Sequence, residues 1–330
     1  MRAVICKAFG EPETLIVEEV PAPMPGDGEI RIAVAAAGVN FADILMVGGG
    51  YQESPEFPFT PGLEVAGTVL DCGVGVTGFA PGDRVMAGCV QGGFAEQAIV
   101  PAGDAYRLPD GMGFDLAGGF PVAYGTAYGA LAWRADLKRG ETLLVLGAAG
   151  GVGLTAVEVG KAMGATVIAA AGGPSKCAIA QDHGADHVID YRAENLRQRV
   201  REITEGAGCQ VIFDPVGGDV FDTALRCLAW EGRLIVIGFA SGRIPKAPAN
   251  ILLVKNCGVL GFYWGAYRRR EPMRFRAAFD ELLAWYGEAR LKPHVSMTLP
   301  LERAGEALNL LRDRRSTGKV VLAVEPRVMD

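Results

Sequence analysis

The sequence predicts an α/β protein in which a parallel sheet, covered by helices on both faces, is inserted into a second, β-rich domain. Three observations lead to this fold class. Short strands between turns fill the first third of the chain, strands and helices alternate from about residue 121, and the C-terminal segment returns to β character. We expect the β domain to comprise 1–121 and 266–330, and the parallel-sheet domain to comprise 122–265.

The β domain is predicted from two segments with alternating or β-branched residues, 29–39 (EIRIAVAAAGV) and 64–73 (EVAGTVLDCG). Turn-forming clusters such as PGDG and GVGVTGFAPGDR bound these segments. Short strands at intervals of about ten residues are typical of a β-barrel or a β-sandwich. The segments SMTLPL and KVVLAVEP near the C-terminus have the same character, so we expect them to complete this domain.

In the central part of the chain, strands and helices alternate as they do in a parallel sheet with two helical layers. The first three expected strands are TLLVLG, TVIAAAGG and HVIDY, and the helical stretches LTAVEVGKAMGA and SKCAIAQDHGA lie between them. The alternation continues through QVIFDPVG, DVFDTALRCLA, RLIVIGFASG and GVLGFYW. Two further helices are expected over 272–289 and 301–312, and the first of them is amphipathic.

Composition and charge restrict the classes of function. The chain has 330 residues and a formal net charge of −6, which gives no support for a nucleic-acid-binding protein. Its seven cysteines are an odd number without a C-x-x-C pair, which favours a reduced setting over a disulfide framework. The N-terminal apolar run is too short for a signal peptide, and no run of about 18 apolar residues occurs. We therefore expect a soluble, cytoplasmic protein with no membrane partner.

A glycine-rich turn is the strongest local signal. The apolar strand 143–146 runs into Gly147-Ala148-Ala149-Gly150-Gly151-Val152-Gly153 and then into a helix. Glycines allow backbone N–H groups to approach a pyrophosphate, and a helix N-terminus adds partial positive charge. A second strand follows about twenty residues later, as a dinucleotide-binding unit requires. The sequence therefore predicts a dinucleotide site, and Ala148 at the first glycine position still permits the turn.

The end of that second strand indicates which dinucleotide is bound. An acidic residue there would accept hydrogen bonds from the ribose hydroxyls of NAD, but the segment 169–174 (AAAGGP) contains none. Lys176, at the start of the next helix, offers a positive charge to the 2′-phosphate of NADPH. NADPH is therefore predicted over NADH. The alternative for Lys176 is a solvated surface lysine.

The sequence offers few metal ligands. The three histidines are His183, His187 and His294. Gly184 separates the first two and interrupts a shared helical face, so ordinary packing or surface histidines are favoured over a metal pair. No G-x-S-x-G nucleophile elbow occurs. We expect no metal, and we infer that a bound cofactor carries the chemistry.

Several motifs, in order along the chain, give it a family resemblance. They are Ala36–Asp43, Pro61–Gly67, Gly82–Val85, Tyr124–Tyr128, Ala148–Gly153, Gly184–Asp186 and Thr317–Lys319. Over essentially its whole length the chain resembles the medium-chain dehydrogenase/reductase superfamily, and within it the zinc-free, zeta-crystallin-like quinone oxidoreductases. The resemblance implies a GroES-like β-barrel catalytic domain with an inserted Rossmann dinucleotide-binding domain, and it implies NADPH as the cofactor.

The resemblance also implies positions for the cofactor contacts. Asn40 and Thr126 fall where zinc-free members approach the nicotinamide. Lys176 and Tyr191 fall where those members hold the 2′-phosphate, and Gly172 or Gly173 replaces their usual serine near that phosphate. The residues expected under the pyrophosphate are Ala149, Gly150, Gly151 and Val152. Those expected along the carboxyl edge of the sheet are Val216, Gly238, Phe239, Phe262, Tyr263 and Trp264. Lys319 belongs to the last matching motif and is also expected to contact the cofactor.

Both zinc sites of the zinc-dependent relatives are expected to be absent. Where those relatives have a catalytic cysteine this chain has Asn40, and their His-Glu pair is Leu63-Glu64 here. Only Cys89 closely follows the turn 82–85, after which the relatives carry a four-cysteine lobe. The resemblance thus implies a zinc-independent enzyme that does not oxidise alcohols by Lewis-acid catalysis.

Tyr51 and Asn40 are the residues predicted to act on substrate. Tyr51 stands in a place similar to that of the tyrosine of related enoyl thioester reductases, where a phenol can donate to a developing enolate. The alternative for Tyr51 is an aromatic gate packed over the nicotinamide. The Asn40 amide is suited to orient cofactor or substrate, and Asp43 to fix the loop. Leu45 replaces a second tyrosine of some quinone reductases, which makes the expected pocket more apolar.

Three functions remain open at this point. The first is an NADPH:quinone oxidoreductase, by one- or two-electron reduction. The second is an NADPH-dependent enone or 2-enoyl-CoA reductase. For the arginines 268–270, with Arg274 and Arg276, a solvated face is favoured, and the alternative is contact with CoA phosphates. The third is a non-turnover NADPH-binding protein, crystallin-like or a redox sensor; Tyr51 and Asn40 favour catalysis over it. Family members commonly dimerise through edge strands, so a homodimer through the strand GVLGFYW is expected.

Overall fold

The computed structural model describes residues 1–324, which fall into two compact units. The β unit comprises Met1–Val122 and the C-terminal segment from Pro293, and the parallel-sheet unit comprises Ala123–Lys292. Helix α3 (Pro121–Tyr128) contains the boundary between them. The end of the parallel-sheet domain was predicted at residue 265, whereas residues 266–292 belong to that unit as well.

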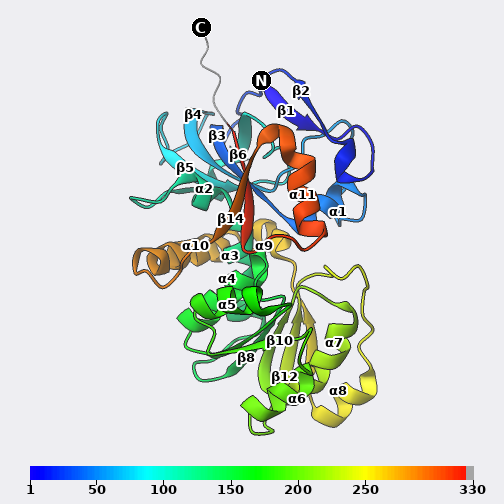
Figure 1. Ribbon diagram of the computed structural model, residues 1–330. Coiled ribbons are helices and arrows are strands. Elements are labelled where there is room, and N and C mark those ends of the chain that lie inside the picture. Colours follow the sequence, from blue (N-terminus) through cyan, green and yellow to red (C-terminus); the bar gives the residue numbers. More distant parts are fainter. Residues whose placement is uncertain (325–330) are drawn as a thin grey trace. The chain divides into compact units, whose positions relative to one another are not determined.

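An antiparallel sheet forms most of the β unit (Figure 1). Its strand order is β14-β15-β3-β4-β5-β7; β6 also pairs with β3, β14 and β15 are parallel, and β1 and β2 form a separate pair. The strands are β1 (Arg2–Ile5), β2 (Ile16–Glu19), β3 (Glu29–Val39), β4 (Glu64–Cys72), β5 (Arg84–Gly88), β6 (Gln97–Pro101), β7 (Ala105–Arg107), β14 (Val295–Pro300) and β15 (Lys319–Ala323). The helices are η1 (Pro12–Thr14), α1 (Phe41–Val47), η2 (Ala102–Asp104), α2 (Phe114–Gly118), η5 (Leu301–Arg303) and α11 (Ala304–Arg312).

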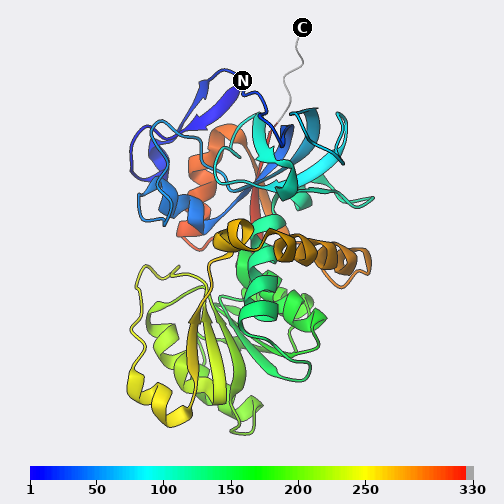
Figure 2. The same cartoon turned by 180° about the vertical axis from the view of Figure 1, so that it is seen from behind.

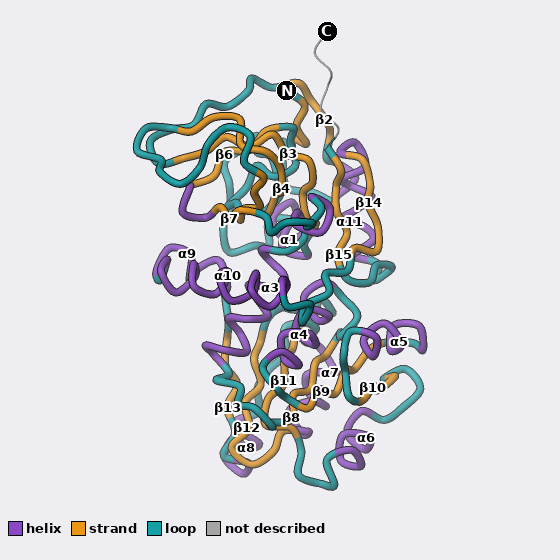
Figure 3. Tube along the Cα trace, turned by 90° about the vertical axis from the view of Figure 1, so that its left-hand side faces the viewer, coloured by secondary structure: helices purple, strands orange, loops and turns teal. Residues whose placement is uncertain are grey.

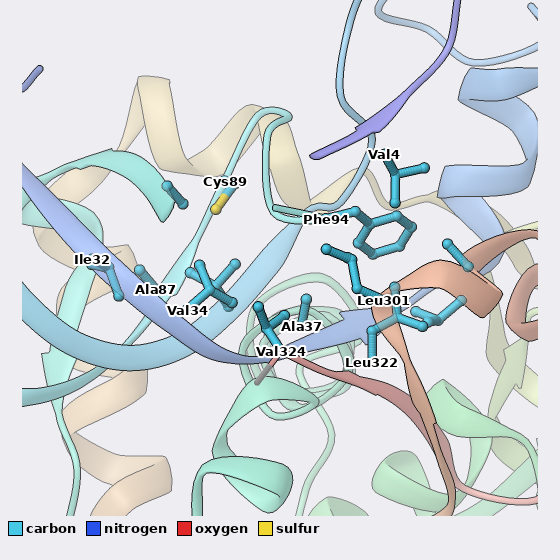
Figure 4. Close-up of a cluster of buried hydrophobic side chains, with 14 of the residues drawn as sticks. Val4, Ile32, Val34, Ala37, Ala87, Cys89, Phe94, Leu301, Leu322 and Val324 are labelled. Carbon is cyan, nitrogen blue, oxygen red and sulfur yellow. The ribbon is translucent and has the colours of Figure 1, made fainter. Parts of the chain in front are cut away.

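The core of the β unit follows from the alternation in β3. Ile30, Ile32 and Val34 are buried at every second position, because successive side chains of a strand point to opposite faces of the sheet. They pack with residues of β4, β5, β15 and α11. Figure 4 shows part of this cluster, which includes Ile32 and Val34 of β3 together with Phe94 and Leu322. This core supports the ends of β3, β4 and β15, where the polar residues described below lie.

The parallel-sheet unit has six strands in the order β10-β9-β8-β11-β12-β13, all parallel (Figures 2 and 3). The strands are β8 (Thr142–Leu146), β9 (Thr166–Ala171), β10 (His187–Asp190), β11 (Cys209–Asp214), β12 (Leu228–Val236) and β13 (Gly258–Gly261). The helices are η3 (a π-helix, Gly129–Arg134), α4 (Gly151–Ala162), α5 (Pro174–Asp182), α6 (Leu196–Ile203), α7 (Gly218–Ala224), η4 (Leu225–Cys227), α8 (Ala249–Lys255), α9 (Trp264–Arg270) and α10 (Pro272–Gly287). The predicted doubly wound sheet is confirmed.

The strand order reverses between β8 and β11, which makes their carboxyl ends a topological switch point. Helices α6 and α7 pack against one face of the sheet, where Leu196 and Phe221 meet Leu144 and Ile212. Helix α4, which follows β8, covers the opposite face (Figure 1). In open sheets of this kind a crevice for ligands forms at the switch point. The fold therefore places the turn after β8 and the loop after β11 at the expected binding edge.

An aromatic cluster explains why residues 266–292 belong to the parallel-sheet unit. Trp264 stacks with Trp133 and with Phe275, whose ring centroids lie 5.6 and 4.2 Å away. Phe279 and Tyr267 join the same group of rings. Burial of such large rings is a main source of packing energy. The cluster thus attaches α9 and α10 to η3, a contact between segments far apart in sequence that periodicity does not reveal.

Several predicted elements are shorter in the structure. Strand β13 ends at Gly261, and Trp264 already begins α9. The helix expected through Ala229 is α7 followed by η4, since residues 228 and 229 belong to β12. The helix over 301–312 begins as the 3₁₀ turn η5. Glu325 and Pro326 of the expected last strand lie outside the described residues.

Candidate cofactor and active site

Two glycines, Gly147 and Gly153, allow the turn after β8 to form. Gly147 has φ +59°, so the left-handed position falls on a glycine, one residue before Ala148. A Cβ on Gly153 would lie 2.2 Å from the Gly147 carbonyl oxygen, so only glycine fits at 153. Helix α4 begins at Gly151, and its N-cap residue Gly150 offers no side-chain acceptor. The first backbone N–H groups of α4 are therefore suited to an anionic ligand such as a pyrophosphate.

A buried carboxyl group shapes the loop after β11. Asp214 is fully buried, and its Oδ1 accepts hydrogen bonds from the N–H groups of Val216 (2.8 Å) and Gly217 (2.9 Å). Burial raises the pKa of this carboxyl group above its usual range. A Cβ on Gly147 would lie 3.0 Å from Val216 Cγ2. Asp214 thus fixes the backbone of the loop whose Val216 side chain lies next to the glycine-rich turn.

The loop after β12 reaches the same edge of the sheet. A Cβ on Gly217 would lie 3.1 Å from the Phe239 ring, and the Ala240 N–H donates to the Pro215 carbonyl at 3.1 Å. The predicted contact residues Val216, Gly238 and Phe239 therefore belong to one group of adjoining loops. Phe262 and Trp264 lie in the aromatic cluster, where the Trp264 ring stacks with Trp133 and Phe275, and their contacts with a cofactor stay predictions.

Basic and phenolic side chains converge at the end of β9. A Cβ on Gly172 would lie 2.9 Å from Arg192 Nε and 3.2 Å from the Tyr191 hydroxyl. Asp190 Oδ1 accepts the N–H groups of Gly173 (2.9 Å) and Arg192 (3.0 Å), which fixes the local backbone. Lys176 is half-buried in the first turn of α5. The structure thus brings Tyr191 to Gly172, as the resemblance implies, and adds Arg192.

Arg192 was missed by the sequence reasoning, although it directly follows Tyr191. Its guanidinium forms no ion pair with an acidic side chain among residues 1–324. A guanidinium presents several N–H donors in a planar fork that suits phosphate. The signal available in the sequence was a basic residue two positions after the last residue of β10, next to a predicted phosphate contact.

A buried polar network at the end of β3 holds Asn40 in one orientation. Asn40 Oδ1 accepts from Lys319 Nζ at 2.6 Å, and its Nδ2 donates to Glu64 Oε1 at 2.9 Å and to the Gly38 carbonyl at 3.3 Å. Lys319 Nζ also donates to Glu64 Oε1 (2.8 Å) and to the Val39 carbonyl (2.9 Å). All three ammonium donors and both amide donors therefore have acceptors within the β unit.

This network ties several segments together. Glu64 Oε2 accepts the Val122 N–H at 2.7 Å, at the start of α3. Asp43 is fully buried and accepts the N–H groups of Asn40 (2.8 Å) and Gly62 (3.2 Å). Burial raises the pKa of Asp43 to about 7, while those N–H groups and Lys319 act in the opposite direction. The structure thus supports the predicted role of Asp43 in fixing this loop. For Asn40 and Lys319 it shows a local network, and their contacts with a cofactor stay predictions.

Tyr51 lies in the segment after α1 and is half-buried. It packs against a small apolar cluster that contains Met46, Phe59 and Leu63. Thr126 lies on α3 in the parallel-sheet unit and is 9% exposed. The structure describes the surroundings of both residues, and their predicted contacts with the nicotinamide remain predictions.

Two further findings concern expectations from the sequence. Among residues 1–324, no group of three or more His, Cys, Asp or Glu side chains is placed to hold a metal ion. Within the same part of the chain, no helix has the length and apolar character needed to span a membrane. His183 contacts the buried carboxylate of Glu158, which agrees with the packing role favoured for it.

Comparisons with known proteins place the chain in a family. Residues 26–110 match the alcohol dehydrogenase GroES-like domain, and residues 151–284 match the zinc-binding dehydrogenase family. The chain is 44% identical to quinone oxidoreductase-like protein 2 homolog from Nematostella vectensis, over 97% of this chain and 88% of that protein. It is 35% identical to a quinone oxidoreductase from Pseudomonas aeruginosa, over 96% and 97% of the two chains.

A solved structure shows the same fold. The chain superposes on Escherichia coli quinone oxidoreductase complexed with NADPH with a TM-score of 0.92 and 31% identity, covering 98% of this chain and 100% of that one. The protein therefore belongs to the quinone oxidoreductase branch of the medium-chain dehydrogenase/reductase superfamily. The predicted family is confirmed, and so is the combination of a GroES-like domain with a Rossmann-type parallel sheet.

Proposed function

We propose that this protein is an NADPH-dependent quinone oxidoreductase that works without zinc. The observation that carries the proposal is the end of β9, where Gly172 takes the place of an acidic residue and Arg192 and Tyr191 converge on it. A carboxylate there would repel a 2′-phosphate, whereas a guanidinium and a phenol donate hydrogen bonds to it. The relatives named quinone oxidoreductase, one of them complexed with NADPH, support the same function.

The residues present fit this cofactor, which supplies a hydride when bound. The N–H groups at the start of α4 would bind the pyrophosphate, because nothing in the Gly150 N-cap competes for them. Asp214 would keep the adjoining loop in place through its two backbone hydrogen bonds. Arg192, Lys176 and Tyr191 would hold the 2′-phosphate.

Zinc independence rests on what Asn40 and Glu64 do in the β unit. Zinc-dependent relatives have a catalytic cysteine at the first position, and an amide is a poor ligand for zinc. Both oxygens of Glu64 already accept hydrogen bonds, from Lys319, Asn40 and Val122. The Lys319 ammonium supplies a positive charge within this group of side chains.

Tyr51 distinguishes quinone reduction from reduction of a conjugated double bond. A quinone accepts a hydride with little help, whereas an enone needs a donor at its oxygen. Tyr51→Phe is therefore expected to lower kcat for enones about 100-fold and to change kcat for quinones less than threefold, since general acid catalysis contributes roughly this much. Anaerobic NADPH oxidation with quinones, enones and short 2-enoyl-CoA thioesters measures both effects.

The wild-type protein in the same assay tests the proposed function. We expect turnover of quinones to exceed that of enones and thioesters. Faster turnover of enones or thioesters would identify a double-bond reductase instead, and NADPH binding without oxidation by any acceptor would favour a non-turnover protein. A drop in quinone turnover with unchanged enone turnover in Tyr51→Phe would contradict the assignment of Tyr51 as the donor.

We also propose that the protein forms a homodimer and works in a reducing, cytoplasmic setting. Strand β13 is at the end of the sheet, and among residues 1–324 it pairs only with β12. The nearby helix α8 exposes Leu253 and Val254, and an open edge strand beside apolar side chains is suited to pairing with a second copy. The seven cysteines are free thiols, which supports a reducing setting.

A further inference from the structure

Two aromatic side chains remain exposed beside the segment that carries Tyr51. Phe9 is 48% exposed and Phe57 is 41% exposed. Their ring centroids lie 4.7 Å apart with an interplanar angle of 73°, an edge-to-face contact. Phe57 also lies 5.6 Å from Phe59, which is buried in the cluster that includes Tyr51. We call Phe9 and Phe57 the aromatic pair.

Backbone contacts hold this pair against the segment that carries Tyr51. Cys6 and Phe59 exchange two backbone hydrogen bonds, of 2.8 and 3.1 Å, which join the segments of the two rings. The Gly10 N–H donates to the Val47 carbonyl at 3.0 Å, at the end of α1. The Phe9 ring lies so close to Gly49 that a Cβ there would come within 2.9 Å of it. The aromatic pair therefore adjoins the loop of the proposed substrate residue.

The charged residues near the pair are mainly acidic. Glu53 and Glu56 lie in the same loop, between Tyr51 and Phe57, and Glu56 is exposed. Lys7, two residues before Phe9, forms an ion pair of 2.7 Å with Glu18. An apolar surface beside acidic side chains favours an uncharged ligand over an anionic one.

We infer that Phe9 and Phe57 form a subsite for a planar, uncharged quinone. The subsite would bind the ring of this quinone that is remote from the carbonyl group that reacts. The inference rests on the proposed function and names its substrate class: quinones with two or more fused rings and no anionic group. Aromatic rings give such a ligand a stacking surface, and their edge-to-face contact leaves ring area exposed. The acidic residues disfavour substrates that carry phosphate groups, such as CoA thioesters.

Direct binding of oxidised quinones tests the subsite. Equilibrium dialysis of the NADP⁺-loaded protein would use tetramethylbenzoquinone, dimethylnaphthoquinone and an anthraquinone sulfonate. These three quinones are chosen because their ring positions are either blocked or unreactive toward the thiols of the protein. Phe57→Leu and Phe9→Leu keep an apolar side chain and remove the ring. Each is expected to raise the Kd and KM of dimethylnaphthoquinone about fivefold, the size of one aromatic contact, and to leave kcat and the Kd of tetramethylbenzoquinone unchanged within twofold.

The matched control is Trp230→Leu, which removes an exposed ring from the parallel-sheet unit. It is expected to leave all three Kd values unchanged. The double variant Glu53→Gln/Glu56→Gln is expected to tighten binding of the sulfonate and leave the neutral quinones unaffected. The subsite is overturned if the two phenylalanine variants bind every quinone as the Trp230 variant does. A wild-type protein that reduces no quinone would overturn the proposed function, which is a different result.

Discussion

Replacement of Gly172 by aspartate is expected to weaken NADPH binding about 100-fold and to improve NADH binding. The new carboxylate would stand next to Arg192 Nε and the Tyr191 hydroxyl, which lie 2.9 and 3.2 Å from the position of a Cβ on Gly172. It would pair with the guanidinium, repel a 2′-phosphate and accept hydrogen bonds from the ribose hydroxyls of NADH. Loss of a hydrogen bond to a charged group, about 1.5–3 kcal/mol, accounts for a change of this size. Fluorescence titration with each nucleotide measures the two Kd values.

Gly172→Asn is the matched control, since it has the same size without the charge. It is expected to weaken both nucleotides by similar factors. Arg192→Gln and Lys176→Glu should each weaken NADPH far more than NADH, because both remove a positive charge from the same place. Equal losses for the two nucleotides in these variants would contradict a 2′-phosphate site at the end of β9.

Lys319→Met is expected to destabilise the protein by about 3–5 kcal/mol, the usual cost of removing one partner of a buried ion pair. Glu64 is fully buried and would keep a negative charge that, within residues 1–324, only the Asn40 amide and the Val122 N–H would offset. Asn40 would also lose the donor that fixes its amide. The midpoint of urea unfolding, followed by circular dichroism, measures the effect.

The double variant Lys319→Met/Glu64→Gln provides the control. With the ammonium gone, the Asn40 amide is free to turn and present its oxygen to the N–H groups of the new amide at position 64. The oxygen of that new amide would still accept from the Val122 N–H. Most of the lost stability is therefore expected to return. If Lys319→Met instead kept full stability and lost NADPH affinity, Lys319 would be a cofactor contact, as the family resemblance implies, and not a structural residue.

The sequence predicted the parts of the fold that depend on local patterns. The alternation in β3 and the run from the apolar strand β8 into the glycine-rich turn are local, and both elements lie where periodicity and glycine spacing indicate. The domain boundary near residue 265 was wrong because it depends on contacts distant in sequence. Trp264 packs with Trp133 and Phe275, and no local pattern marks that packing.

The sequence predicted the residues at the end of β9 better than the polar network around Asn40. Gly172 and Tyr191 were predicted as neighbours and lie together in the structure. Arg192 was missed because its position depends on how the backbone turns at Asp190 after β10. The Asn40–Lys319–Glu64 network was missed for a similar reason: it joins the ends of β3, β4 and β15, and only the register of those strands brings the three side chains together.

We propose that this protein transfers reducing equivalents from NADPH to quinones without zinc. The most direct test is anaerobic NADPH oxidation by chelator-treated protein with dimethylnaphthoquinone, with the zinc content of the same sample measured by atomic emission. We predict sustained NADPH oxidation at a zinc content far below one atom per chain, and no increase when zinc is added. Absence of quinone-dependent oxidation, or activity that disappears on chelation and returns with zinc, would contradict the claim.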